Sequence, residues 1–175
     1  MSFPIVEEST VLKKTTDFLI NRGVIPYRFS VARGRGINSS EVLSSISQKF
    51  ASAGINPAFS ASGADIEGIS EKEWWRIECK GSGTGTSQTQ RNNFDRALAS
   101  VVTYFELPPY TLLSNSEEVK NAKLFLGLAL PASPHYLREL KRRVRPSLRM
   151  HLNLWILLYD PVLESVKDFA PSHEF

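Results

Sequence analysis

Cysteine is almost absent from this chain of 175 residues, which contains only Cys79. A single thiol can neither close an internal disulfide nor build a thiolate metal site by itself. The three histidines, at positions 135, 151 and 173, are scattered and do not show the spacing of metal ligands. These absences exclude a disulfide framework and give no support to a metal site built from cysteine or histidine.

Long apolar runs are missing as well. No run reaches the roughly 18 residues that a membrane-spanning helix needs, and the N-terminus lacks the pattern of a secretory signal. Hydrophobic residues make up 42% of the chain and charged residues 22%, which are ordinary values for a globular protein. We therefore expect one domain over residues 1–175, located in the cytoplasm and without a membrane partner.

Positive charge is small in total but unevenly placed. The formal net charge is +3, yet residues 131–149 contain six basic residues and a single acidic one, Glu139. A second basic cluster, at positions 22, 28, 33 and 35, has no acidic residue between Asp17 and Glu41. Arginine dominates both clusters, and its guanidinium group suits two-point contacts with phosphate. This distribution favours a polyanionic partner.

The most informative stretch runs from residue 63 to residue 80. Residues 74–80, WWRIECK, are rich in aromatic side chains and precede glycines, which predicts a strand. Residues 64–69 can pair with that strand as a hairpin through the polar turn at residues 70–73. Because side chains alternate on a strand, Glu78 and Lys80 are expected on one face, and the hairpin brings Asp65 toward Glu78.

This trio of charged groups has two interpretations. Paired carboxylates form a hard oxygen site that suits Mg²⁺ or Mn²⁺, and a neighbouring lysine can orient water and stabilise negative charge. Such a site could activate water against a phosphodiester. Alternatively, the three groups are ordinary charges on a solvent-facing hairpin, where cross-strand pairs contribute less than about 1 kcal/mol each.

Asp65 followed by Glu78-Cys79-Lys80, with a helix expected before the hairpin and another after it, resembles the PD-(D/E)XK nuclease superfamily. The resemblance implies a restriction endonuclease-like core at about residues 38–130, within a central mixed β-sheet flanked by helices. It also implies that Asp65, Glu78 and the carbonyl group of Cys79 bind Mg²⁺ or Mn²⁺, and that Lys80 positions the attacking water.

Other positions of the resembled family leave alternatives open. Its aspartate is often preceded by proline, whereas Ala64 stands here, so either Asp65 or Glu67, on the same strand face, could be the first ligand. Members of the family often carry an acidic residue on a helix, and several branches carry a glutamine on the helix after the hairpin. Glu41 and Gln90 occupy such places, but each also lies in a capping-box pattern and could instead cap its own helix.

Residues 81–87, GSGTGTS, invite a nucleotide-binding interpretation, because glycine-rich turns before a helix can hold phosphate. The pattern lacks the Gly-Lys-Ser/Thr ending of a phosphate-binding loop, and Thr86 stands where the dinucleotide motif needs its third glycine. We expect these glycines to let the backbone approach a substrate phosphate, or simply to form a loop.

The second half of the chain predicts a strand–helix–strand unit, followed by a tail with little pattern after residue 160. Residues 123–130 and 152–159 are typical of buried strands, and residues 133–145 predict a helix that Pro146 ends. Such a unit implies a right-handed parallel crossover, and hence an α/β fold with helices on both sides of a mixed sheet. The helix carries a basic stripe that could bind phosphate or be merely solvated. The residues expected to contact nucleic acid are Arg33, Arg35, Arg91, Arg138, Lys141, Arg142 and Arg145.

These patterns and the resemblance predict a metal-dependent nuclease that hydrolyses phosphodiester bonds of nucleic acid, with DNA as the expected substrate and Mg²⁺ or Mn²⁺ as the cofactor. Its expected catalytic residues are Asp65, Glu78, Lys80, Gln90 and Glu41. A chain of this size would need a partner protomer to cut both strands at once, which favours a homodimer or larger assembly. The alternative is a non-catalytic subunit of the same fold that binds nucleic acid or recruits other proteins.

Overall fold

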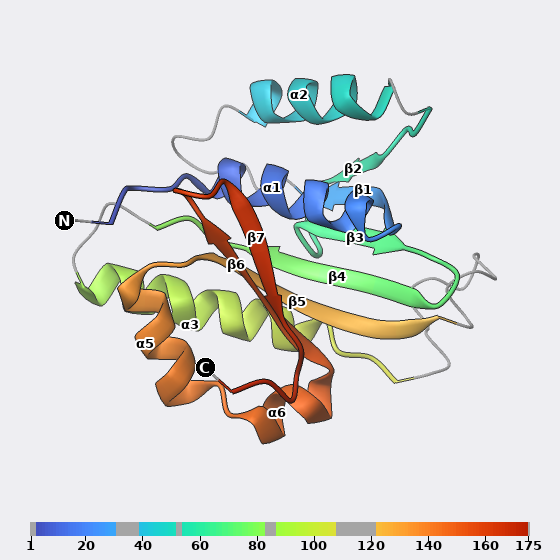
Figure 1. Cartoon of the computed structure of the whole chain (residues 1–175). Helices are drawn as coiled ribbons and strands as arrows, with labels where there is room; N and C mark the ends of the chain where they lie inside the picture. Colours follow the sequence, from blue (N-terminus) through green and yellow to red (C-terminus); the bar gives the residue numbers. More distant parts are fainter. Residues whose placement is uncertain (1–2, 31–38, 52–53, 83–86, 108–121, 175) are drawn as a thin grey trace.

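The chain folds around one mixed β-sheet (Figure 1). The computed structural model describes residues 3–30, 39–51, 54–82, 87–107 and 122–174. Within those ranges the sheet has seven strands in the order β2-β1-β3-β4-β5-β6-β7. The prediction of an α/β fold with a central mixed sheet is therefore confirmed. No helix in the described ranges combines the length and the apolar character that a bilayer crossing requires.

The helices and strands agree with the sequence patterns through most of the chain. The strands are β1 (Ile25–Ser30), β2 (Ala58–Ser60), β3 (Ile66–Ile69), β4 (Glu73–Cys79), β5 (Lys123–Pro131), β6 (Leu154–Asp160) and β7 (Ser165–Phe169). The helices are α1 (Glu8–Asn21), α2 (Ser39–Ala51), α3 (Ser87–Thr103), α5 (Pro134–Arg143) and α6 (Pro146–Leu152).

The hairpin expected around the acidic residues is present. β3 and β4 pair antiparallel, with Ile66 opposite Ile77. Alternate side chains of β4 enter opposite cores, so that Trp74 packs on one face of the sheet and Trp75 on the other. Every residue of β4 after its first is buried, the charged ones included. The interpretation of the hairpin as solvent-facing is therefore wrong.

Parallel strands form the middle of the sheet. β5 pairs parallel with β4 on one side and with β6 on the other, which confirms the predicted strand–helix–strand unit. α3 connects toward β5, and α5 and α6 connect β5 to β6. Because parallel strands end at the same edge of a sheet, the C-terminal end of β4 lies at the same edge as the start of α5.

Helices cover both faces of the sheet: α1 and α2 lie on one side, and α3 and α5 on the other (Figure 1). Each side buries its own apolar cluster, and such burial contributes roughly 25 cal/mol per Å² of apolar surface. The α1 side includes Val11, Leu19, Phe29, Trp75, Ile77 and Leu157, and the α3 side includes Trp74, Phe94, Val101, Leu126, Leu140 and Ile156.

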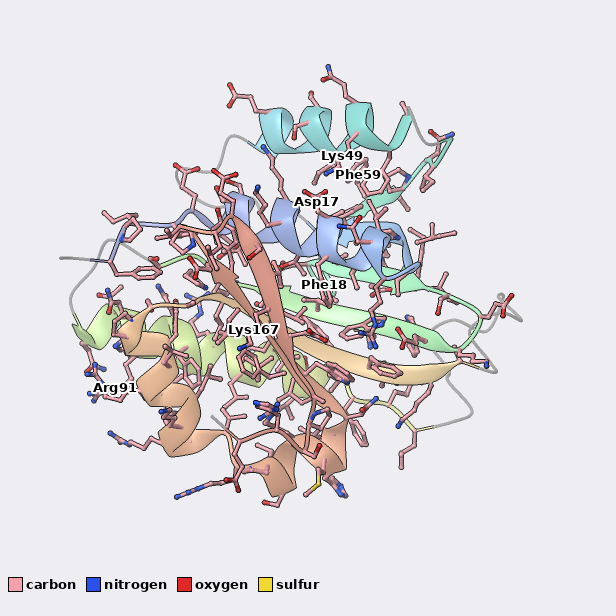
Figure 2. The ribbon with its side chains drawn as sticks, viewed as in Figure 1. Asp17, Phe18, Lys49, Phe59, Arg91 and Lys167 are labelled. Carbon is pink, nitrogen blue, oxygen red and sulfur yellow. The ribbon has the colours of Figure 1, made fainter. Side chains whose placement is uncertain are left out.

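α2 and β2 extend the sheet at its β1 edge. β2 pairs with β1, and Phe50 of α2 packs on Phe29 of β1, with ring centroids 5.6 Å apart. Figure 2 shows Lys49 of α2 and Asp17 of α1 pointing toward each other, where they form an ion pair. These contacts hold α2 against α1 and β1.

One expectation for the C-terminal region is wrong, and one strand there was not predicted. The helix predicted over residues 133–145 ends at Arg143, and Pro146 begins a further helix, α6, because proline fits the first turn, where its missing N–H is not needed. The residues after Asp160 form an antiparallel hairpin in which β7 pairs with β6. β7 is an edge strand that is at most half-buried, so its sequence shows little apolar alternation.

Arg149, one of the six basic residues of the 131–149 cluster, is not a surface charge. Its side chain is fully buried and donates hydrogen bonds to the carbonyl oxygens of Phe169 (2.9 Å), His173 (2.6 Å) and Ala170. A longer bond of 3.5 Å reaches the carbonyl oxygen of Leu154. The guanidinium group therefore fastens the C-terminal segment to the start of β6.

Replacing Arg149 by Lys should lower the free energy of unfolding by roughly 2–4 kcal/mol, because an ammonium group cannot reach carbonyl groups on both segments and remains buried. Urea denaturation at neutral pH measures the effect. Arg145→Lys, at an exposed position, is the matched control and should change stability by less than about 0.5 kcal/mol. Equal stability of the two variants would contradict the anchoring role.

Candidate active site

The ammonium group of Lys80 is the centre of a charged cluster at the C-terminal end of β4. It lies 2.9 Å from Oε1 of Glu78 and donates a 3.0 Å hydrogen bond to the carbonyl oxygen of Cys79. A backbone hydrogen bond of 2.9 Å from Lys80 to Ala129 of β5 continues the strand pairing to this residue. The predicted proximity of Glu78 and Lys80 is therefore confirmed.

Asp65 reaches the same end of β4 from the neighbouring strand. It directly precedes β3, and the register that places Ile66 opposite Ile77 brings it beside Glu78. Its Oδ2 accepts a 2.7 Å hydrogen bond from the amide of Cys79. The two carboxylates and the amine thus converge, as the hairpin pairing predicted.

A third carboxylate, which no sequence pattern indicated, joins the cluster. Glu8, the first residue of α1, lies 3.4 Å from the ammonium group of Lys80. Its approach depends on Gly81, because a Cβ at that position would lie 2.6 Å from the amide nitrogen of Glu8 and 2.7 Å from the carbonyl oxygen of Val6. Ser82 fixes the same segment by donating a 2.8 Å backbone hydrogen bond to Val6.

Glu67, the alternative first ligand, has a different task. Its buried carboxylate accepts a 2.9 Å hydrogen bond from the hydroxyl of Tyr27 and lies 3.5 Å from the guanidinium group of Arg76. The guanidinium group of Arg28 lies 4.0 Å from the same oxygen, Oε1, that Arg76 approaches. These partners make Glu67 part of a structural ion pair, and they leave Asp65 as the carboxylate beside Glu78 and Lys80.

Tyr104, which follows α3, is a second residue that the sequence did not single out. Its hydroxyl donates a 2.6 Å hydrogen bond to Oε2 of Glu78 and lies 3.2 Å from the carbonyl oxygen of Gly63. Burial raises the pKa of Tyr104, and the bond to Glu78 raises it further. The hydroxyl therefore stays protonated and serves as a donor at neutral pH.

The helix residues predicted for the site are not seen to reach it. Glu41 is exposed in the first turn of α2, and within the described part of the chain it makes no hydrogen bond or ion pair with Asp65, Glu78 or Lys80. The helix that supplies a carboxylate is α1. Gln90 is half-buried on α3, and in the described part of the chain its amide forms no hydrogen bond with Asp65, Glu78 or Lys80.

The basic residues predicted to contact nucleic acid lie partly on one face of the molecule. Arg33 and Arg35 fall outside the described residues. The exposed basic residues of α3, α5 and the turn after α5 are Arg91, Arg96, Arg138, Lys141, Arg142 and Arg145, and all of them except Arg96 were predicted to contact nucleic acid. Three basic side chains of α5 line a shallow depression of about 450 Å³ together with Pro134 and Leu137 of the same helix; they are Arg138, Lys141 and Arg142. Figure 2 shows Arg91 at the beginning of α3, on the same side of the molecule as α5.

α5 is tied to the charged cluster by a direct contact. The hydroxyl of Tyr136, a buried residue in the first turn of α5, donates a 2.7 Å hydrogen bond to the carbonyl oxygen of Gly81. Arg143, at the other end of the helix, is engaged with Asp95 of α3 and with Glu139. The basic stripe is therefore held at a fixed place relative to Lys80.

Burial and the neighbouring charges together set the protonation of Asp65 and Lys80. Removal from water raises the pKa of Asp65 to about 7, with a further contribution from the charge of Glu78, while Lys80 and the Cys79 amide act against the rise. Burial lowers the pKa of Lys80, but the carboxylates of Asp65, Glu8 and Glu78 outweigh this effect and raise it overall. Lys80 is thus a permanent cation near neutral pH, and Asp65 is the group that titrates.

Side chains alone provide only some of the oxygen ligands that a hard divalent cation needs at this site. In the ranges that the structure describes, no three His, Cys, Asp or Glu side chains form a ready metal cluster. Two carboxylates, Asp65 and Glu78, would be completed by the Cys79 carbonyl oxygen and by water, which suits Mg²⁺ because this ion keeps several of its waters. The raised pKa of Asp65 fits the same interpretation, since a nearby cation would favour its ionised form.

Comparisons with known proteins add no further information: no protein-family model matches this chain, and no curated protein or solved structure matches it.

Asp65 makes the stability of the metal-free protein depend on pH. Between the ordinary pKa of 3.8 and the raised value of about 7, the folded protein keeps a proton that the unfolded chain has released, so stability falls as pH rises through this window. Asp65→Asn should remove this part of the pH dependence and stabilise the protein at pH 8 by roughly 1–3 kcal/mol.

Thermal or urea unfolding between pH 4 and pH 8, in the presence of a chelator, measures this dependence. Glu71→Gln, an exposed carboxylate in the turn of the same hairpin, is the matched control and should keep the wild-type profile. An Asp65→Asn profile parallel to that of the wild type would show that Asp65 does not titrate in this range.

Proposed function

We propose that this protein is a metal-dependent nuclease that hydrolyses phosphodiester bonds of nucleic acid, with DNA as the substrate and Mg²⁺ or Mn²⁺ as the cofactor. The observation that carries the proposal is the meeting of Asp65, Glu78 and Lys80 at the end of one hairpin, with Glu8 as an additional carboxylate. A structural ion pair needs one acid for one base, whereas this cluster holds three acids and one base.

The fold is consistent with a restriction endonuclease-like core. Helix α2, the hairpin β3–β4, helix α3 and strand β5 follow one another in the order that the resemblance implies. Helix α1 lies outside the expected range of residues 38–130, yet it supplies the acid that the resemblance assigns to a helix. We therefore extend the proposed nuclease core to include α1 and β1.

Each residue of the cluster has a chemical task in this proposal. Asp65, Glu78 and the Cys79 carbonyl oxygen hold the cation, whose chemistry when bound is Lewis-acid polarisation of phosphate and promotion of water ionisation. Lys80 orients the attacking water and stabilises negative charge on the phosphate; because its pKa is raised, it acts as a cation and not as a base. Glu8 is the more accessible carboxylate, 32% exposed against 7% for Glu78, and accepts the proton from water.

The basic face supplies the complementary surface for the substrate. The stripe on α5 points outward and is connected to the cluster through Tyr136 and Gly81. Phosphates of the bound strand on either side of the scissile bond would lie along this stripe, and their binding would release counterions. Such contacts recognise the backbone and carry no sequence preference.

Lys80→Ala should lower the rate of Mg²⁺-dependent cleavage of a labelled DNA fragment by at least about 100-fold. The reason is that the negative charge on the attacked phosphate loses the ammonium group that stabilises it. Because the loss of the ammonium group leaves Glu78 without its cation, circular dichroism and thermal unfolding first establish that the variant is folded. Lys72→Ala, at an exposed position in the turn of the same hairpin, is the matched control and should cleave like the wild type. Cleavage by Lys80→Ala at the wild-type rate would refute the assignment.

Binding of Mn²⁺ separates the nuclease from a non-catalytic binding subunit. The proposal expects one Mn²⁺ site that is lost in Asp65→Ala and in Glu78→Ala, measured by calorimetry without nucleic acid. A subunit that only binds nucleic acid would show no such site and only a salt-dependent affinity for polyanions.

The double variant Arg138→Ala/Arg142→Ala should weaken DNA binding. It should also reduce the magnitude of the slope of log affinity against log salt concentration by about 1–2, because each lost phosphate contact lowers it by about 1. Fluorescence anisotropy over a range of salt concentrations measures the slope. The control Lys72→Ala/Lys123→Ala removes two exposed lysines at the opposite end of β4 and β5 and should leave the slope unchanged. The same loss of slope in both double variants would mean that the α5 stripe is not the binding face.

A further inference from the structure

We propose that Tyr104 is a positioning residue of this site, which holds one carboxylate oxygen of Glu78 so that the other faces the cation and Lys80. The inference rests on the proposed function and concerns a residue outside the motif that first indicated it. Tyr104 itself touches neither substrate nor cation in this proposal.

The contacts of Glu78 show the division between its two oxygens. Oε2 accepts the 2.6 Å hydrogen bond from the hydroxyl of Tyr104, whereas Oε1 lies 2.9 Å from the ammonium group of Lys80. A carboxylate held at one oxygen cannot rotate about its terminal bond without losing that hydrogen bond. Oε1 is therefore the oxygen left on the side of Lys80.

The same hydroxyl also reaches the segment that carries Asp65. It lies 3.2 Å from the carbonyl oxygen of Gly63, two residues before Asp65 in the turn that leads into β3. One phenol group thus bridges the strand that bears Glu78 and the turn that bears Asp65. Both proposed cation ligands are placed by reference to a single side chain.

Tyr104 is in turn fixed by a buried ion pair. Arg76 donates a 3.0 Å hydrogen bond to the backbone carbonyl of Tyr104, and its guanidinium group lies 5.0 Å from the centre of the Tyr104 ring. The same guanidinium pairs with Glu67 on β3 and lies 5.4 Å from the centre of the Trp74 ring. Because these groups are buried, Tyr104 has little freedom to move away from Glu78.

Through these contacts Arg76 holds Tyr104, and Tyr104 in turn orients the carboxylate of Glu78. A carboxylate that must bind a cation benefits from a second hydrogen bond that fixes its orientation, and loss of such a bond typically costs 10- to 100-fold in metal affinity or activity. Replacement of the hydroxyl alone, with the ring kept on Arg76, isolates this contribution.

The test compares Tyr104→Phe with the wild type and with Tyr27→Phe. Tyr27 is a matched control because its hydroxyl also donates to a partly buried network, with a 2.9 Å hydrogen bond to the carboxylate of Glu67, which does not bind the cation in our proposal. Circular dichroism and thermal unfolding establish that all three proteins are folded. Calorimetry with Mn²⁺ alone then gives the dissociation constant, and cleavage of labelled DNA at saturating Mn²⁺ gives kcat and KM.

We expect Tyr104→Phe to bind Mn²⁺ about 10- to 100-fold more weakly than the wild type, with a lower kcat and an unchanged KM for DNA. Tyr27→Phe should lose stability but keep the wild-type affinity for Mn²⁺. Equal affinities in all three proteins, or equal losses in both variants, would overturn the positioning role while leaving the nuclease proposal intact. Absence of Mn²⁺ binding and of cleavage by the wild type would overturn the nuclease proposal, and the role of Tyr104 with it.

Discussion

Glu78 and Glu8 both pair with the single ammonium group of Lys80, and the largely buried Asp65 lies beside them, bonded to the amide of Cys79. Burial, with the neighbouring charge of Glu78, raises the pKa of Asp65, so this carboxyl group either keeps a proton or gains a cation. Asp65 shows the first outcome in the protein alone, since its pKa lies near neutrality. The rest of the structure can be understood as the framework that keeps these groups together despite their repulsion.

That framework draws on parts of the chain that are distant in sequence. The hairpin supplies two carboxylates and the lysine, the N-terminal end of α1 supplies Glu8, and the residue after α3 supplies Tyr104. Gly81 permits the approach of Glu8, because any side chain at position 81 would collide with the backbone of residues 6–8. The buried ion pair between Arg76 and Glu67 lies beside Tyr104. Burying such a pair is rarely stabilising by itself, but Arg76 also donates a hydrogen bond to the carbonyl oxygen of Tyr104 and so holds this residue in place.

The basic residues divide into two groups once their partners are known. Arg149 is buried and binds carbonyl oxygens, and the partly exposed Arg143 pairs with the carboxylates of Asp95 and Glu139. The exposed members on α5 remain available to a partner, and the helix that carries them is joined to the glycine next to Lys80. A polyanion along this helix would therefore approach the cluster, which links the two features that support a nuclease.

The sequence by itself determined the hairpin, its alternation of side chains, and the meeting of Asp65, Glu78 and Lys80, because strand periodicity and antiparallel pairing are local rules. It also determined the parallel unit of β5 and β6, because nearly continuous apolar runs are typical of parallel strands that are buried on both faces of a sheet. It did not indicate that Glu8 and Tyr104 contact Lys80 and Glu78, nor which of Asp65 and Glu67 lies beside Glu78. Those outcomes depend on which helix packs over the end of β4, on the room left at residue 81 and on the position of Arg76, and only the tertiary structure decided them.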